Sequence, residues 1–256
     1  MFRIDNFIDN GNVRVIDALG AFQVAEYERD LSVTPETATK AFFCGKMNVR
    51  RRQLICDVAQ SDIVCQAGAM QIMVGNVNAT SGVKGLGDLI GKAFRSKTTG
   101  ESAIKPEYTG NGTMILEPTY KHIILLDADE WNGSIVLDDG LFLACEASLR
   151  QRTVMRSNLS SAVAGGEGLF NLCLSGSGAL AIEAPCPREE LIEITLEKDV
   201  LKIDGNFAIA WSDTLEFTVE RSGKTLVGSA VSGEGLVNVY RGTGKVLLTP
   251  VIDGGL

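Results

Sequence analysis

Hydrophobic residues in this chain of 256 residues occur in short runs separated by turns that contain glycine. At residues 192–196 apolar and polar positions alternate, which is typical of a strand with one buried and one solvated face. Short apolar runs at residues 123–126 and 135–137 also indicate strands. Turn signals recur about every 8 to 12 residues, a spacing typical of all-β sandwiches and barrels. The pattern predicts an all-β fold with one or two short helices.

Three places along the chain share one arrangement, in which a glycine turn joins two apolar runs. The turn glycines are Gly68, Gly140 and Gly205, which lie 72 and 65 residues apart. Glycine at such a place supplies the positive φ of a tight turn between two strands. We therefore expect three hairpins with the same turn geometry.

A second motif, a glycine followed by a glutamate, repeats in step with these turns. Its glutamates lie 66 and 67 residues apart, and the pairs are Gly100 and Glu101, Gly166 and Glu167, and Gly233 and Glu234. Each is followed by a further pair of glycines, beginning at Gly110, Gly176 and Gly242, and then by an apolar stretch and a proline. A shared period of this kind indicates one structural unit built three times.

The period divides the chain into an N-terminal extension at residues 1–45 and three repeats, at 46–118, 119–185 and 186–256. A unit of about 67 residues buries little of its surface alone, so we expect the three to pack as one compact body. The prediction is three tandem β-sandwich repeats with a pseudo-threefold arrangement.

The extension is predicted to hold two strands and a short helix. Thr34 is a preferred N-cap residue, and the proline that follows it is accepted in a first helical turn. Gly45 is placed to end the helix. We expect Phe42 and Phe43 to dock the helix on the sheets.

A second helix is predicted at residues 85–97, where apolar residues recur at helical spacing with lysine and arginine between them. We interpret its apolar stripe first as a cover for the end of a sheet. The alternative is peripheral contact with a membrane surface or a partner. No apolar run approaches the roughly 18 residues that a membrane span requires, so we expect no transmembrane segment.

The net charge of −8 and the pI of about 4.8 argue against a broad phosphate-binding surface, so nucleic acid is not the expected partner. The basic run at residues 50–52 is interpreted as a solvated strand end. Six cysteines occur without a C-x-x-C motif, and several lie in apolar runs. They indicate a reducing compartment, and we expect a cytoplasmic protein.

Chemistry-bearing motifs are sparse in the sequence. His122 is the one histidine, and no G-x-S-x-G motif accompanies it, so we predict no catalytic residue, no metal site and no cofactor. The glutamates of the repeated pairs are the best functional candidates, because three carboxylates brought together could bind a hard cation such as calcium. We interpret them as structural, with each carboxylate accepting backbone N–H groups in a turn.

The segments at residues 68–77, 99–102 and 232–246 resemble the altered-inheritance-of-mitochondria family, whose function is unknown. The resemblance extends over roughly residues 50 to 250. The family's fold is similar to that of the tryptophan RNA-binding attenuator protein, a small β-sandwich, so the resemblance implies attenuator-like repeats. It supplies no accepted catalytic residues, and similarity of fold alone does not establish function.

Three hypotheses for function remain at this point. The leading one is a non-enzymatic scaffold or binding protein that associates with another protein or with itself. The second is a nucleic-acid-binding module of attenuator type. The third is a β-sandwich that binds a small molecule or a metal ion.

Overall fold

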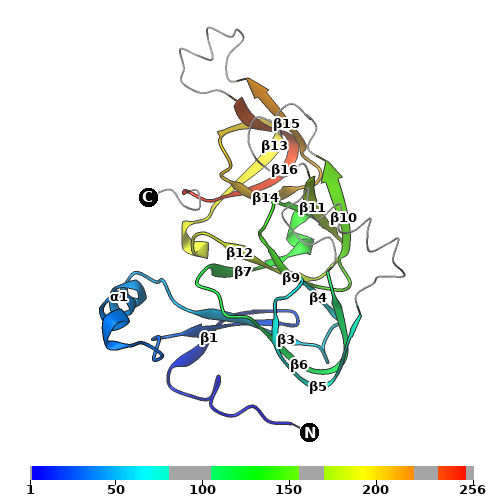
Figure 1. Ribbon diagram of the computed structural model, residues 1–256. Helices are drawn as coiled ribbons and strands as arrows, with labels where there is room; N and C mark the ends of the chain where they lie inside the picture. Colours follow the sequence, from blue (N-terminus) through cyan, green and yellow to red (C-terminus); the bar gives the residue numbers. More distant parts are fainter. Residues whose placement is uncertain (1, 81–104, 156–169, 222–235, 252–256) are drawn as a thin grey trace.

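The computed structural model describes residues 2–80, 105–155, 170–221 and 236–251. This part of the chain consists mostly of strands, which form two curled sheets (Figure 1). It also contains one α-helix and two 3-10 turns. The prediction of an all-β fold is confirmed.

Within the described residues, the first sheet has nine antiparallel strands. They are β1 (Val13–Leu19), β2 (Phe22–Tyr27), β3 (Arg52–Asp57), β4 (Ile63–Cys65), β5 (Met70–Thr80), β6 (Glu107–Leu116), β7 (His122–Asp127), β9 (Phe142–Glu146) and β12 (Ala179–Ala184). Their order is β1-β2-β3-β6-β4-β9-β12-β7, and β5 pairs with β6 beside this path. Strands β1 and β7 are therefore the two ends of the sheet.

The second sheet has seven strands within the same residues. They are β8 (Ser134–Leu137), β10 (Arg150–Met155), β11 (Phe170–Ser175), β13 (Ile192–Asp204), β14 (Ala208–Ser212), β15 (Glu216–Arg221) and β16 (Leu236–Leu248). Their order is β10-β11-β8-β14-β16-β13, with β15 on β16. Residues 119–185 thus contribute strands to both sheets, and the boundaries of the three repeats stay a prediction.

The glycine turns have the predicted backbone geometry but not the predicted pairing. Gly68, Gly140 and Gly205 have φ angles of 82°, 78° and 74°. The strands on either side of each turn pair with other strands, and β8 and β9 belong to different sheets. The prediction of hairpins is therefore wrong, because the two strands that each turn connects do not pair with each other.

The glycines that follow the Gly-Glu pairs form a second set with similar φ angles. Gly110, Gly176 and Gly242 have φ angles of 125°, 129° and 123°. A Cβ at Gly110 would lie 2.2 Å from the carbonyl oxygen of Asn76 on the paired strand, so only glycine fits there. The three glycines of the sequence repeat thus share one backbone conformation, while the pseudo-threefold arrangement stays a prediction.

Among the described residues, three apolar clusters form the core, one near β1–β6, one where the two sheets meet, and one within the second sheet. Their buried members include Phe22, Leu54 and Met114, then Leu137, Leu174 and Leu180, and then Trp211, Tyr240 and Val246. Five of the six cysteines are buried as well, and all six are free thiols.

The helix α1 (Pro35–Lys46) begins as predicted, with Thr34 at its N-cap in an extended conformation. It does not end at Gly45, because the N–H of Met47 still donates to the carbonyls of Phe43 and Cys44 at 3.1 and 3.0 Å. The expectation that Phe42 and Phe43 dock the helix is also wrong, since these side chains are 60% and 61% exposed. Its half-buried residues are small or short, namely Ala41, Cys44 and Gly45.

Candidate binding cleft

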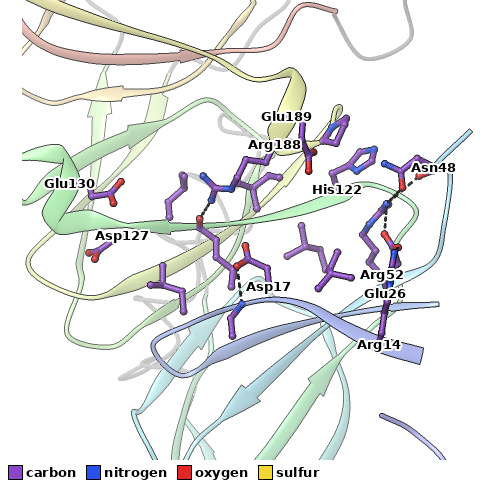
Figure 2. A pocket seen from close by; sticks show the side chains of 18 residues that line it. Arg14, Asp17, Glu26, Asn48, Arg52, His122, Asp127, Glu130, Arg188 and Glu189 are labelled. Atoms are coloured by element: carbon purple, nitrogen blue, oxygen red, sulfur yellow. Dashed lines mark hydrogen bonds and ion pairs between the residues drawn. The ribbon is translucent and has the colours of Figure 1, made fainter. Parts of the chain in front are cut away.

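A cleft of about 620 Å³ lies between β1 and β7, the two ends of the first sheet. Figure 2 shows the two strands on opposite sides of it. In the described residues, no backbone hydrogen bond joins β1 to β7, so side chains rather than a strand ladder occupy the space between them. The volume is typical of a ligand pocket.

The β7 wall presents main-chain groups to this cleft. β7 pairs with β12, and the next hydrogen bond of that ladder runs from the N–H of Ala128 to the carbonyl of Gly178 at 3.0 Å. In an antiparallel edge strand, every second residue directs its backbone N–H and C=O groups to the neighbouring strand. Ala128 does so, and Ile123 and Leu125 lie an odd number of residues away from it. Their main-chain groups therefore point away from β12 and towards the cleft. An edge of this kind is a template for pairing with another chain.

Two arginines bind carbonyl oxygens on the same side of this segment. The guanidinium of Arg188, from the 3-10 turn η2 (Arg188–Glu190), donates to the carbonyl of Leu125. Nη1 of Arg52 lies 3.5 Å from the carbonyl of Lys121. Charged side chains therefore cover part of the β7 edge, which is a common way to prevent unwanted strand pairing.

The floor of the cleft near β1 is a cross-strand row of charges. Arg14 on β1 lies opposite Glu26 on β2, and Glu26 lies opposite Arg52 on β3. Direct cross-strand neighbours share one face of a sheet, so the register alone brings the three side chains together. Arg50, which precedes β3, completes the group.

Glu26 is the centre of this row. Its Oε2 lies 2.8 Å from Nη2 of Arg52, and its Oε1 lies 3.0 Å from Nη1 of Arg50 and 3.2 Å from Nη2 of Arg14. Glu26 and Arg52 are only 3% and 2% exposed. Buried charges are tolerated when they are paired and hydrogen-bonded, and Asn48 supplies two further acceptors to Arg52, at 2.9 and 3.2 Å.

The pKa of Glu26 follows from two opposed effects. Burial raises the pKa of this carboxyl, while Arg52, Arg14 and Arg50 lower it, and the net result is a pKa below the ordinary value of 4.5. Glu26 is therefore ionised near neutral pH, as its three cationic neighbours require.

His122 stands at the start of β7, as the sequence indicated. Burial and the positive charge of Arg52 lower its pKa to about 4, against smaller opposite effects from Glu26 and Glu189. The imidazole is neutral at pH 7 as a result. Among the described residues that line the cleft, no serine, threonine or cysteine occurs, so the histidine has no nucleophile beside it there.

The opposite end of the cleft is acidic. Figure 2 shows Asp127 and Glu130 at that end, away from Arg52 and Glu26. Glu130 belongs to the 3-10 turn η1 (Ala128–Trp131), and the carboxylate of Asp127 caps this turn by accepting from the N–H of Asp129 at 3.0 Å. Asp17 of β1 also lines the cleft. The cleft therefore combines a β7 wall with a paired charge network at one end and carboxylates at the other.

The structure does not describe the residues that the sequence put forward as candidates. Gly100, Glu101, Gly166, Glu167, Gly233 and Glu234 fall outside the described residues, as does the predicted helix at residues 85–97. The described part of the chain contains no group of three or more His, Cys, Asp or Glu side chains that could hold a metal ion. It also contains no helix with the length and apolar character of a membrane span.

The interpretation of the basic run at residues 50–52 as a solvated strand end is wrong. Arg52 is buried because Glu26 and Asn48 surround its guanidinium with acceptors. Sequence reasoning missed this network. The available signal was an arginine two residues before the apolar residues of β3, together with an acidic residue inside the apolar run of β2.

Comparison with known proteins identifies the family. The family model described as Mitochondrial biogenesis AIM24 matches residues 47–251, and the chain belongs to this family, which confirms the resemblance drawn from the glycine motifs. An uncharacterized protein from Streptococcus pyogenes serotype M6 is 30% identical over 194 residues, which are 73% of this chain and 75% of the relative. An X-ray structure of a Streptococcus pyogenes protein, solved by a structural genomics consortium, is 26% identical with a TM-score of 0.57, and the match covers 80% of this chain and 90% of that one.

Proposed function

We propose that this protein is a non-enzymatic binding protein of the cytoplasm, and that the cleft between β1 and β7 receives its ligand. The observation that carries the proposal is that the two ends of the first sheet face each other across about 620 Å³ without a backbone hydrogen bond between them in the described residues. Strands of one sheet on two sides and a paired charge network at one end make this a preformed site, as ligand sites usually are.

The ligand that fits this cleft best is an extended segment of a partner protein. The main-chain groups of Ile123 and Leu125 point towards the cleft, and an extended peptide can pair with such an edge through its own backbone. The acidic end, with Asp127 and Glu130, favours a segment that carries a basic side chain there. In the unbound protein the Arg188 guanidinium takes the place of a peptide N–H at the carbonyl of Leu125.

The chemistry of the lining supports binding over catalysis and over RNA recognition. His122 is neutral at pH 7 and has no hydroxyl or thiol nucleophile among the described lining residues. Asp17, Asp127 and Glu130 would repel the phosphates of a nucleic acid. The free thiols of the six cysteines support a reducing compartment.

Site-specific photo-cross-linking tests the proposal in cells of the source organism. Ile16 lines the cleft and is 43% exposed, whereas its neighbour Val15 is 42% exposed and does not line it. A photoreactive phenylalanine analogue at position 16 should cross-link to one defined peptide segment of another protein, and the same analogue at position 15 should not. A synthetic copy of that segment should then protect the amides of Ile123 and Leu125 from hydrogen exchange.

Two results would overturn the proposal. One is an identical cross-linking pattern from positions 15 and 16. The other is turnover of a metabolite by the purified protein that His122→Gln abolishes, since a binding protein has no reaction for this histidine to serve.

A further inference from the structure

The helix α1 lies at the periphery of the molecule (Figure 1, left edge), and none of its residues lines the cleft. All twelve of its residues are described, and none of them is buried. Short helices are marginal in water on their own, and in folded proteins they are usually held by burying an apolar face. This helix leaves its largest apolar side chains in solvent instead.

Four exposed side chains define what we call the α1 patch. They are Leu31, Phe42, Phe43 and Met47, which are 65%, 60%, 61% and 77% exposed. The rings of Phe42 and Phe43 meet edge to face with centroids 5.5 Å apart. Exposed apolar patches rimmed by polar residues mark interaction sites, because water contact with them is unfavourable.

The charges around the patch are mainly positive. The helix carries Lys40 and Lys46 against the single acidic residue Glu36, in a chain whose net charge is −8. The ammonium of Lys46 lies 5.5 Å from the ring centroid of Phe42, so a cation sits directly beside the exposed aromatic pair. Charge complementarity therefore calls for an anionic surface opposite the patch.

We propose that the α1 patch docks on the surface of an anionic lipid bilayer. The phenyl rings of Phe42 and Phe43 would enter the boundary between headgroups and acyl chains, and Lys40 and Lys46 would lie at the level of the phosphates. A second copy of this chain is a poorer occupant, because a face-to-face pair would bring the same lysines against each other. Residues 35–46 precede the family match at 47–251, so the phenylalanines and lysines of the proposal lie outside that match and only Met47 of the patch lies within it.

Vesicle co-sedimentation of the full-length protein tests the proposal. The protein should bind vesicles of phosphatidylcholine with about one-third phosphatidylglycerol, bind pure phosphatidylcholine at least about tenfold less, and dissociate as NaCl rises from about 0.05 to about 0.5 M. The double variant Phe42→Ala with Phe43→Ala should lower the vesicle-bound fraction at least about tenfold, since it removes most of the inserted apolar area. Lys40→Glu with Lys46→Glu should have a comparable effect.

Matched controls use exposed residues on β13. Ile192→Ala with Val200→Ala removes side chains that are 48% and 46% exposed, and Lys198→Glu with Lys202→Glu repeats the charge reversal there. Both controls should bind vesicles like the parent. In addition, the fluorescence of Phe43→Trp should shift to the blue on anionic vesicles, which reports insertion directly.

Failure of the wild-type protein to bind anionic vesicles at low salt would overturn the proposal and would leave a protein partner as the occupant of the patch. Binding that survives the phenylalanine substitutions, or that the β13 controls reduce equally, would overturn it too. Neither result depends on the cleft, because none of the substituted residues lines it.

Discussion

The helix α1 and the strand β3 are separated by only a few residues, yet they invert the usual burial of apolar and charged side chains. Phe42 and Phe43 are 60% and 61% exposed, whereas Arg52 is 2% exposed. The difference lies in what surrounds each side chain. Glu26 and Asn48 supply acceptors to the guanidinium of Arg52, while the two phenyl rings keep most of their surface in solvent. Burial here is decided by the partners that the fold provides and not by the polarity of the residue alone.

The two regions also differ in how much their side chains contribute to the stability of the folded state. A buried ion pair stabilises only as a complete set, because removing one member leaves an uncompensated charge in a poorly solvated place. An exposed phenyl ring adds little to folding, because its surroundings in the folded and unfolded chain are similar. The charged region should therefore be sensitive to substitution and the apolar region tolerant, which reverses the usual expectation for these residue types.

The largest effect is expected at the centre of the ion network. Among the described residues, Glu26 is the only one whose carboxylate forms an ion pair with Arg52, and Glu26→Gln removes that pair and also weakens the contacts of Arg14 and Arg50. We expect the free energy of unfolding to fall by about 3 kcal/mol at neutral pH, as is typical when a buried pair loses one partner. Urea denaturation followed by circular dichroism measures this loss.

An exposed pair in the second sheet supplies the control for this prediction. The side chains of Glu220 and Arg241 are 37% and 35% exposed, and Glu220→Gln should lower stability far less than Glu26→Gln does, because water screens this pair. Adding Arg52→Met to Glu26→Gln should restore part of the lost stability, because the unpaired charge disappears. Equal losses for Glu26→Gln and Glu220→Gln would show that burial does not distinguish the two pairs.

Local sequence patterns predicted the elements well, because strands and turns depend on neighbouring residues. The apolar runs at residues 123–126 and 135–137 lie within β7 and β8, and Thr34 caps α1 as expected. The turn glycines Gly68 and Gly140 have the positive φ that their position indicated. These features follow from short-range sterics and periodicity, which a single sequence contains.

Pairing between strands could not be predicted in the same way. β8 pairs with β11 and β14, which come much later in the chain, and the runs themselves carry no information on which partner each strand takes. The cleft was missed for this reason, since it exists only because β1 and β7 end the same sheet. The contact of Glu26 with Arg52 likewise depends on the register of β2 and β3, which the helix α1 separates in sequence.

A smaller effect is expected from His122 when the pH falls. Burial and Arg52 lower the pKa of this imidazole from 6.5 to about 4. The histidine of the unfolded chain takes up a proton as the pH drops below 6.5, whereas that of the folded chain does so only near pH 4. The free energy of unfolding therefore keeps its full value above pH 6.5 and decreases as the pH falls from 6.5 to about 4. Unfolding free energies at about pH 7 and about pH 5 should show the loss in the parent protein.

His122→Gln isolates this contribution, because glutamine does not titrate. The variant should lose less stability than the parent between the same two pH values. Glu26 does not interfere in this interval, since its pKa is below 4.5 and its stabilising effect disappears only at lower pH. An identical pH dependence in both proteins would contradict the assignment.

Arg188 occupies an intermediate position in the comparison, because it is an exposed cation that covers a main-chain edge. Arg188→Ala should lower the free energy of unfolding by about 1 kcal/mol, the value of a typical hydrogen bond. Hydrogen exchange of the Ile123 and Leu125 amides should become faster at the same time. Exchange that accelerates equally at Ile192 of β13 would indicate a general loss of stability instead of an opened edge.

The smallest effect on stability is expected at the exposed phenylalanines. Phe42→Ala with Phe43→Ala should change the free energy of unfolding by no more than about 0.5 kcal/mol, because the rings are largely solvated and alanine is the better helix former. Phe22→Ala, at a fully buried position, should by contrast cost about 3 to 5 kcal/mol. Thermal denaturation of the three proteins side by side measures both. A loss in the double variant that approaches the loss at Phe22 would mean that α1 is held by its aromatic face, and the contrast between the helix and the charge network would then no longer hold.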